Sequence, residues 1–311
     1  MIIDQGPPDT WDSPVDGSAV AIGVFDGVHR GHRQVLAALD KALVTTKVAL
    51  TFGTHPAEVL SDRGAPPLLT PLRERLRLLQ EAGVDRVAVL DFDDAMVEMS
   101  PEAFVKQVLV DGLNAKFVAV GEDFRFGNRA RGSTETLIEL GGRHGFDVAI
   151  VPILREDGME IRSTAIRQAI AAGEVERAAN LLGRPYLITG VVVPGEGRGA
   201  TIGVPTANIS FPNRLAVPPR GVYAVFAEID GTTLPAVANF GVRPTFGGET
   251  EVLEVHILDG DYDLAGKEVG VQFMARLRDE QRFDGVDALV AQIQADIAAA
   301  GDYLDGVTQA L

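Results

Sequence analysis

Two histidines three residues apart, His29 and His32, lie in the glycine-rich segment G-V-F-D-G-V-H-R-G-H, residues 23–32. An apolar run at 19–22 predicts a buried strand before the segment, and apolar periodicity predicts a helix after it. Glycines allow a sharp turn and close approach of a ligand, and the start of a helix favours anions. We therefore predict a nucleotide-phosphate site here rather than a plain turn with two surface histidines. Its further residues are Gly23, Phe25, Asp26 and Gly31.

A second glycine-rich loop, residues 121–133, follows the predicted strand at 117–120 and reads G-E-D-F-R-F-G-N-R-A-R-G-S. Arginine side chains suit phosphate because the guanidinium is planar and always charged. Phenylalanine rings in the same loop can pack beside a flat ring. A solvated basic surface loop is the alternative interpretation. The candidate residues are Asp123, Phe124, Arg125 and Phe126.

The segment I-R-S-T-A-I-R, residues 161–167, places Ser163 and Thr164 at a predicted helix start and Arg167 on its first turn. Hydroxyls, unpaired N–H groups and a guanidinium at one helix end predict a clamp for a triphosphate. An ordinary helix cap explains the two hydroxyl residues equally well.

In the second half of the chain, Thr206 and Asn208 offer a hydroxyl and an amide oxygen on one face of an extended segment. Oxygen ligands of this kind suit Mg²⁺, although Pro-Thr-x-Asn is also typical of a turn. Glu254 and His256 alternate with apolar residues and so share one face of a predicted strand. The alternative is that they form the solvent face of an edge strand.

The elements that position these residues change character along the chain. Apolar runs alternate with helical patterns up to about residue 153, which predicts an α/β fold with a doubly wound parallel sheet. Ligands bind at the carboxyl ends of strands in such sheets, where the first two motifs begin. Two short helices are expected over 163–183.

Past residue 185 the chain shows strand-like runs separated by turns, and then a helix at about 285–304. This pattern predicts a small antiparallel β-barrel with a terminal helix. We place the domain boundary near Gly183, giving domains 1–183 and 184–311.

Composition limits the class of protein. The chain has 311 residues, no cysteine and a net charge of −16. The cysteine count excludes disulfides and thiol chemistry, and the acidic balance disfavours broad nucleic-acid binding. We find no signal-type leader and no bilayer-spanning run, so no membrane partner and a cytoplasmic location are expected.

The ordered motifs resemble those of the bifunctional bacterial riboflavin kinase/FAD synthetase family. The resemblance extends over essentially the whole chain after residue 18 and includes further blocks in both domains. They are T-F-G-T-H-P (51–56), L-L-T-P-L-R-E-R-L (68–76), L-L-G-R-P-Y (181–186), G-V-P-T-A-N (203–208), N-F-G-V-R-P-T-F (239–246) and R-L-R-D-E-Q-R-F (276–283).

The resemblance implies an enzyme that phosphorylates riboflavin to FMN and then adenylylates FMN to FAD, using ATP twice and releasing pyrophosphate. It implies that His29, His32 and Arg167 act on the adenylyl group, and that Glu254 is the base for the riboflavin hydroxyl. The resemblance also implies that residues 123–126 bind the flavin and that Gly195, Gly203 and Pro205 bind ATP. It implies that Thr206 and Asn208 bind Mg²⁺.

Four positions depart from the family pattern, namely Arg162, Ala200, Val204 and Ala265. They bear on the affinity for ATP more than on the core motifs. Two other functions stay open on the sequence: a nucleotidylyltransferase for a different acceptor, and a flavin-binding sensor or storage protein without catalysis. A kinase barrel argues against the first and intact catalytic residues against the second. Oligomeric state is not predicted.

Overall fold

The computed structural model describes residues 1–60, 64–195, 199, 203–245, 248–260 and 262–309, without the side chains of 243–250 and 309. The chain divides into two compact units, Met1–Ser163 and Thr164–Leu311. The division lies 20 residues before the boundary that we predicted. Within the described ranges no helix is long and apolar enough to span a membrane.

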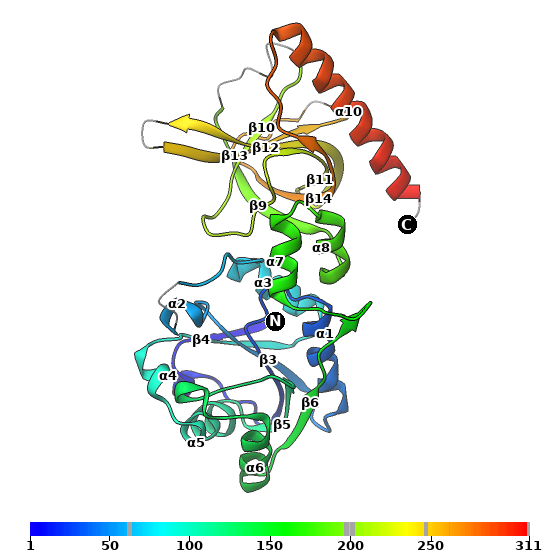
Figure 1. Cartoon of the computed structure of the whole chain (residues 1–311). Helices are drawn as coiled ribbons and strands as arrows, with labels where there is room; N and C mark the ends of the chain where they lie inside the picture. The colour runs from blue at the N-terminus through cyan, green and yellow to red at the C-terminus, as the bar shows by residue number, and fades with distance from the viewer. Residues whose placement is uncertain (61–63, 196–198, 200–202, 246–247, 261, 310–311) are drawn as a thin grey trace. The chain divides into compact units, whose positions relative to one another are not determined.

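The first unit is built on a six-stranded sheet in the order β1-β4-β3-β2-β5-β6 (Figure 1). Every pairing in it is parallel. The strands are β1 (Ile2–Gln5), β2 (Ser18–Ile22), β3 (Thr46–Phe52), β4 (Arg86–Leu90), β5 (Ala115–Gly121) and β6 (Asp147–Val151). The sequence predicted all of them except β1, a short edge strand whose Ile2 and Ile3 stay exposed.

Alternate residues of the buried strands supply two separate cores, one on each face of the sheet. Val20 and Ile22 of β2 face one core, whereas Ala19 and Ala21 face the other. Helices cover both faces, which confirms the doubly wound class. One side has α1 (Arg30–Ala37), η2 (Ala38–Lys41) and α3 (Leu72–Glu81); the other has α5 (Pro101–Phe104), η3 (Val105–Gly112) and α6 (Thr134–His144).

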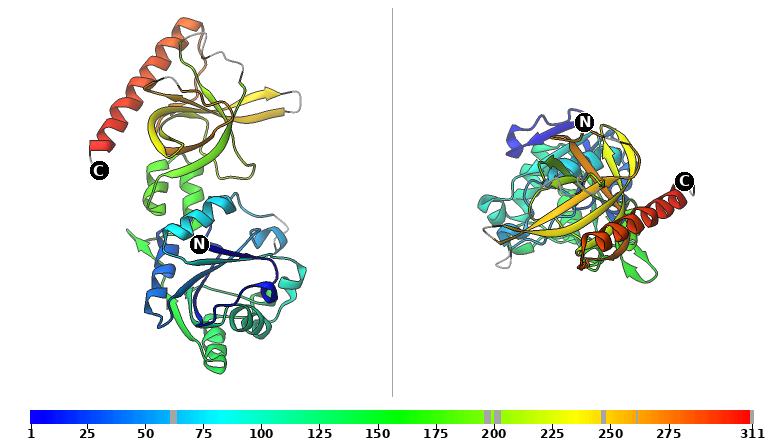
Figure 2. Two further views of the ribbon diagram at one scale, coloured as in Figure 1. Left: turned by 180° about the vertical axis from the view of Figure 1, so that it is seen from behind. Right: turned by 90° about the horizontal axis from the view of Figure 1, so that it is seen from above.

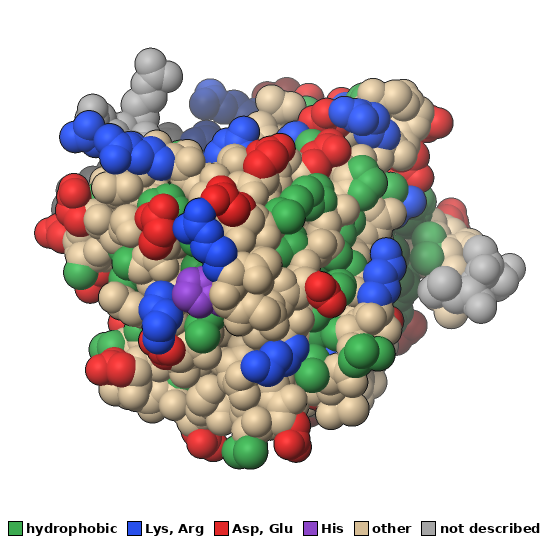
Figure 3. All heavy atoms as spheres, turned by 90° about the horizontal axis from the view of Figure 1, so that it is seen from below, with side chains coloured by type: hydrophobic (Ala, Val, Ile, Leu, Met, Phe, Trp, Pro, Cys, Tyr) green, Lys and Arg blue, Asp and Glu red, His purple; other side chains and the backbone are tan. Residues whose placement is uncertain are grey.

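Shorter elements connect these layers. They are η1 (Pro8–Thr10), α2 (Ala57–Leu60), α4 (Asp94–Glu98), η4 (Asn128–Ala130), β7 (Arg155–Glu156) and β8 (Met159–Glu160). On the face drawn in Figure 3, acidic and basic side chains are interspersed with hydrophobic ones. The acidic side chains therefore do not form one continuous patch on that face.

The second unit begins with two helices and continues into a closed barrel, β10-β13-β12-β11-β14-β9, in which every pairing is antiparallel. The strands are β9 (Tyr186–Val193), β10 (Ala207–Ser210), β11 (Gly221–Ile229), β12 (Thr232–Thr245), β13 (Gly248–Ile257) and β14 (Glu268–Asp279). The barrel confirms the predicted class. The sequence missed β10, because the Pro-Thr-x-Asn segment resembles a turn.

Helices α7 (Ser163–Ala171) and α8 (Val175–Leu182) are the two short helices expected before the barrel. Helix α8 packs against β9 and β14, and its apolar side chains, including Val175 and Leu182, are buried. Burial of these apolar side chains therefore holds α8 against the barrel.

The terminal helix, α10 (Val286–Gln309), lies along the outside of the barrel (Figure 2). Ala300 and Leu304 of α10 form a buried cluster with Val222, Val237 and Ala275 of the barrel strands. The helix therefore covers one side of the barrel wall.

Two candidate active sites

A buried aspartate, Asp26, holds the Gly23–His32 turn in place. The Asp26 carboxylate accepts hydrogen bonds from the backbone N–H groups of Leu69 and Thr70, each at 3.0 Å. The Thr70 hydroxyl in turn accepts a hydrogen bond from the N–H of Gly27 at 3.0 Å. The side chain of Asp26 is only 2% exposed. It braces the turn against the segment that precedes α3.

Arg75 of α3, for which we predicted no role, completes this support. Its guanidinium donates to the carbonyls of Val24 at 2.7 Å and Phe52 at 2.9 Å, at the ends of β2 and β3. Burial lowers the pKa of Arg75 from its ordinary value, and the nearby Asp26 carboxylate opposes that shift. Its position three residues after Leu72 and three before Leu78 places it on the apolar stripe of α3, which was the available signal.

His29 and His32 face each other as stacked rings, with their centroids 3.6 Å apart. His29 is the N-cap of α1, and its Nδ1 accepts a hydrogen bond from the His32 N–H at 3.3 Å. A neutral His29 ring therefore carries its proton on Nε2. Burial lowers the pKa of His32 well below 6.5, and the charges of His29 and Arg75 lower it further.

The Nδ1 atom of His32 is buried and has no hydrogen-bond partner among the described residues. A polar atom in this situation costs free energy unless a ligand or water satisfies it. The paired rings at a helix N-terminus thus form a polar site suited to an anionic group.

Residues 161–163, the first part of the I-R-S-T-A-I-R segment, lie beside this turn in the first unit. The Ser163 hydroxyl donates to the carbonyl of Asp26 at 3.0 Å, although 137 residues separate them. A Cβ at Gly31 would lie 3.2 Å from the His29 ring and 3.3 Å from the carbonyl of Ile161, so a larger residue there would press on both. Thr164 and Arg167 lie on α7, in the second unit.

An apolar cavity of about 400 Å³ opens beside the same turn, at the carboxyl ends of β2 and β3. Phe124, Arg125 and Phe126 of the predicted loop line it, with the two phenyl rings stacked at 5.4 Å. Gly23, another predicted site residue, also lines it. The sequence did not identify the large apolar lining residues, which include Phe52, Phe92, Met96, Met99 and Phe104.

Asp123 behaves differently from its neighbours in this loop. It forms an ion pair with Arg162, with 2.5 Å between Oδ2 and Nη1, and Arg162 also pairs with Glu160 at 2.5 Å. Neither Asp123 nor Arg162 lines the cavity. The pair links the loop to the segment before Ser163.

The barrel site rests on strand register. Asn208 of β10 and Asn239 of β12 both pair with Glu254 of β13, one from each side. Because β13 has a partner on both edges, Glu254 is not on an edge strand, and its side chain is only half-exposed. Asn239 was within a predicted strand, and nothing in its local pattern showed that it would stand beside Glu254.

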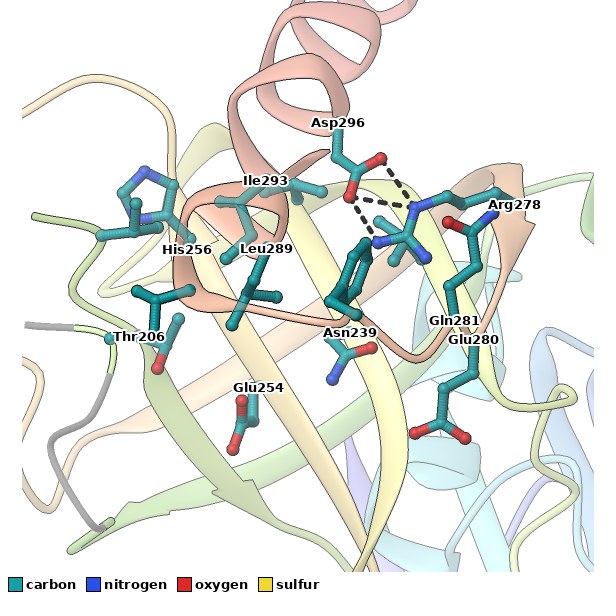
Figure 4. Close-up of a pocket in the computed structure, with 16 residues that line it drawn as sticks. Thr206, Asn239, Glu254, His256, Arg278, Glu280, Gln281, Leu289, Ile293 and Asp296 are labelled. Atoms are coloured by element: carbon teal, nitrogen blue, oxygen red, sulfur yellow. Dashed lines mark hydrogen bonds and ion pairs between the residues drawn. The ribbon is translucent and has the colours of Figure 1, made fainter. Parts of the chain in front are cut away.

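Glu254 lines a cavity of about 510 Å³ between the barrel and α10 (Figure 4). Apolar side chains of α10, Leu289 and Ile293, form the opposite wall. Arg278 of β14 holds the helix there through a paired contact with Asp296, at 2.7 Å and 2.8 Å. A carboxylate therefore faces a largely apolar space of small-molecule size.

A second cavity, of about 460 Å³, lies next to the first. Tyr262, Leu264 and Ala265 line it, and Thr206 and His256 line both cavities. These two residues therefore stand between two spaces, one of which contains Glu254.

The loop before β10 crosses close to this wall. A Cβ at Gly195 would lie 2.0 Å from Nδ2 of Asn208, and one at Gly199 would lie 3.2 Å from Oγ1 of Thr206. Val204 is buried and lines the larger cavity, whereas Gly203 and Pro205 are exposed. Residues 196–198 and Ala200 lie outside the described residues.

The comparisons with known proteins match each unit separately. A family model described as FAD synthetase matches residues 12–165, and one described as riboflavin kinase matches residues 182–304. Several curated relatives named bifunctional riboflavin kinase/FMN adenylyltransferase match nearly the full chain. The protein from Escherichia coli K12 is 42% identical over 96% of both chains, and that from Bacillus subtilis 36% identical over 93% of both.

A solved structure shares the whole two-domain fold. Its title describes a macrolide-efflux protein from Streptococcus pneumoniae, and it is 33% identical to this chain, with a TM-score of 0.89. The alignment covers 97% of this chain and 100% of the other.

Proposed function

The chain belongs to the bifunctional riboflavin kinase/FMN adenylyltransferase family, and we propose that it divides the family's two reactions between its two units. The chain phosphorylates riboflavin to FMN with ATP, and it transfers an adenylyl group from a second ATP to FMN, giving FAD. The second unit carries the kinase residues, and the first carries the His-x-Gly-His turn and the flavin cavity for adenylylation.

In the adenylylation step, the FMN phosphate attacks the α-phosphorus of ATP and pyrophosphate leaves, so no protein nucleophile is required. The cavity lined by Phe124 and Phe126 takes the isoalloxazine ring, since it is apolar and begins at the turn. His29 and His32 donate to the transferring group, and the lowered pKa of His32 favours its neutral ring.

The other residues of this site have supporting parts. Asp26 and Arg75 are positioning residues, because the hydrogen bonds described for their side chains hold the turn and the strand ends beside it. Arg167 is assigned to the phosphates by its place in the family motif. Asp123 orders the flavin loop through its ion pair with Arg162.

In the kinase step, riboflavin occupies the cavity between the barrel and α10, where Glu254 accepts the proton of the ribityl hydroxyl. ATP occupies the neighbouring cavity, with its phosphates at the shared wall formed by Thr206 and His256. The hydroxyl then attacks the γ-phosphorus and ADP leaves. Positioning of the two reactants supplies most of the rate in such a transfer.

Thr206 and Asn208 would hold Mg²⁺ together with the ATP phosphates. Among the described residues no group of three or more His, Asp or Glu side chains forms an all-protein metal site. Mg²⁺ commonly takes few protein oxygens and several from phosphate and water, so the donor set fits. When bound, the ion neutralises phosphate charge during the transfer.

The observation that carries the proposal is that each unit has its own ligand-sized cavity beside its own phosphate-chemistry residues. The test is incubation of the purified chain with riboflavin, ATP and Mg²⁺, followed by chromatography of the flavins. FMN should form first and FAD after it. Supplied FMN with ATP should give FAD and pyrophosphate without any kinase turnover.

A further inference from the structure

His256 makes one hydrogen bond to a segment that no strand ladder holds. The last residue pair of the β10–β13 ladder in this direction is Ala207 with Val255, so Pro205 and Thr206 lie just beyond it. There the Nδ1 atom of His256 lies 2.7 Å from the carbonyl oxygen of Pro205. A carbonyl oxygen can only accept, so the histidine donates its Nδ1–H. The His256 side chain thus adds one hydrogen bond beyond the end of the backbone ladder between β10 and β13.

The carbonyl that it holds belongs to the peptide joining Pro205 to Thr206. Fixing that carbonyl fixes the peptide plane from which the Thr206 side chain emerges. Proline fixes its own φ and has no N–H, so this carbonyl is its only backbone hydrogen-bonding group. The His256 bond therefore helps to set the direction in which the Thr206 side chain leaves the backbone.

The contact between His256 and Pro205 lies at the boundary between the two barrel cavities. Thr206 and His256 are the residues that line both barrel cavities, and each is the chain neighbour of a member of the last ladder pair, Ala207 with Val255. Glu254 lies two residues before His256 on the same face of β13. A shift of Thr206 would thus move the phosphate-holding group relative to Glu254 on the other side of the wall.

We propose that His256 is a positioning residue for phosphoryl transfer, which acts through its Nδ1–H bond to Pro205 to hold Thr206 at the boundary between the two cavities. This inference rests on the proposed kinase site. His256 does not itself accept or donate the transferred proton in this account. Its contribution should appear in the affinity for ATP and in the rate of transfer together.

Two nearly isosteric variants separate the action of Nδ1 from that of the rest of the ring. In His256→Asn the amide nitrogen can occupy the place of Nδ1 and keep the bond to Pro205. In His256→Gln the amide reaches the place of Nε2 and the bond is lost. The measurements are kcat and KM for ATP in the conversion of riboflavin to FMN.

We expect His256→Gln to lower kcat/KM for ATP at least about tenfold, because misplaced phosphate-holding groups are costly in transfer reactions. His256→Asn should stay within about threefold of the unchanged chain, as expected for a retained hydrogen bond. FAD formation from supplied FMN serves as a control in each variant, since it belongs to the other unit. His144→Gln, at an exposed histidine of α6, controls for loss of an imidazole.

An equal loss of kcat/KM in the Asn and Gln variants would overturn the proposal, because the loss would then come from Nε2 or from the ring as a whole. Normal kinase activity in both would overturn it as well. Thermal unfolding of each variant, with intact FAD formation, shows that the chain is folded. If the unchanged chain made no FMN from riboflavin and ATP, the proposed kinase site itself would fail, which is a separate result.

Discussion

The two sites are built by different means, and the difference shows what each one depends on. The His-x-Gly-His site comes from ten consecutive residues at one strand end, fixed by the buried side chains of Asp26 and Arg75. The kinase site has no such segment. Asn208, Glu254 and Asn239 meet only because three strands pair in one register. Local sequence therefore determines the histidine turn of the first site, and barrel closure determines the second site.

Loss of the proposed base should give the largest effect and show that the barrel works alone. Glu254→Gln keeps the size of the side chain and removes the proton acceptor, which should lower riboflavin phosphorylation by ~10²–10⁴-fold. Adenylylation of supplied FMN should continue at the unchanged rate. Rates of FMN and FAD formation, measured separately by chromatography, test this.

A matched control is available on the same strand. Glu251 is exposed and lines neither barrel cavity, so Glu251→Gln should change riboflavin phosphorylation very little. Similar losses in both variants would remove Glu254 from the catalytic role.

The reverse experiment concerns the first unit. His29→Ala combined with His32→Ala should lower FAD formation from FMN by ~10²–10³-fold, because donors to the transferring phosphate are lost. Riboflavin phosphorylation should remain. A double variant that made FAD at the unchanged rate would contradict the site.

The extent of the second unit can be tested by truncation. A fragment 164–311 keeps α7 and α8, whereas 184–311 exposes barrel surface that α8 covers. We expect both fragments to form FMN and neither to form FAD, with the shorter one less stable by ~2–5 kcal/mol. Chemical unfolding of the two fragments measures the difference, and equal stability would show that α8 contributes nothing to the barrel.

The smallest expected effect is on pH dependence. The pKa of His32 in the folded chain lies well below the ordinary value of 6.5, so the unfolded chain binds a proton more readily. This contribution to stability is complete above pH 6.5 and is lost as pH falls below that value. His32→Gln should flatten the acid side of the unfolding profile, and an unchanged slope would show that His32 is not the group responsible.

Much of this molecule could be predicted from the sequence, and the failures have physical causes. Most strands of the sheet and barrel, apart from β1 and β10, followed from periodicity, as did the long helices, and the turn at Gly23–His32 followed from its glycines and histidines. Arg75 was missed because α3 carries three arginines, Arg73, Arg75 and Arg77, and only packing decides which is buried. Asn239 was missed because register between strands distant in sequence has no local signal.

The flavin cavity illustrates the same limit. Phe124 and Phe126 belong to a recognisable glycine-rich loop, but Phe52 ends β3 and Phe92 follows β4, and the two become neighbours only when the parallel sheet forms. Their aromatic type alone is equally typical of a core. Phe52 and Phe92 line the cavity only because the folded sheet brings them together.

The central claim is that two independent sites carry out two successive reactions, and mixing two impaired variants tests it most directly. Glu254→Gln alone should form almost no FMN or FAD from riboflavin and ATP, and the His29→Ala, His32→Ala chain should stop at FMN. An equimolar mixture should form FAD, because FMN released by one chain can bind the intact first unit of the other. Failure of the folded mixture to form FAD, or FAD formation from riboflavin by either variant alone, would contradict the account.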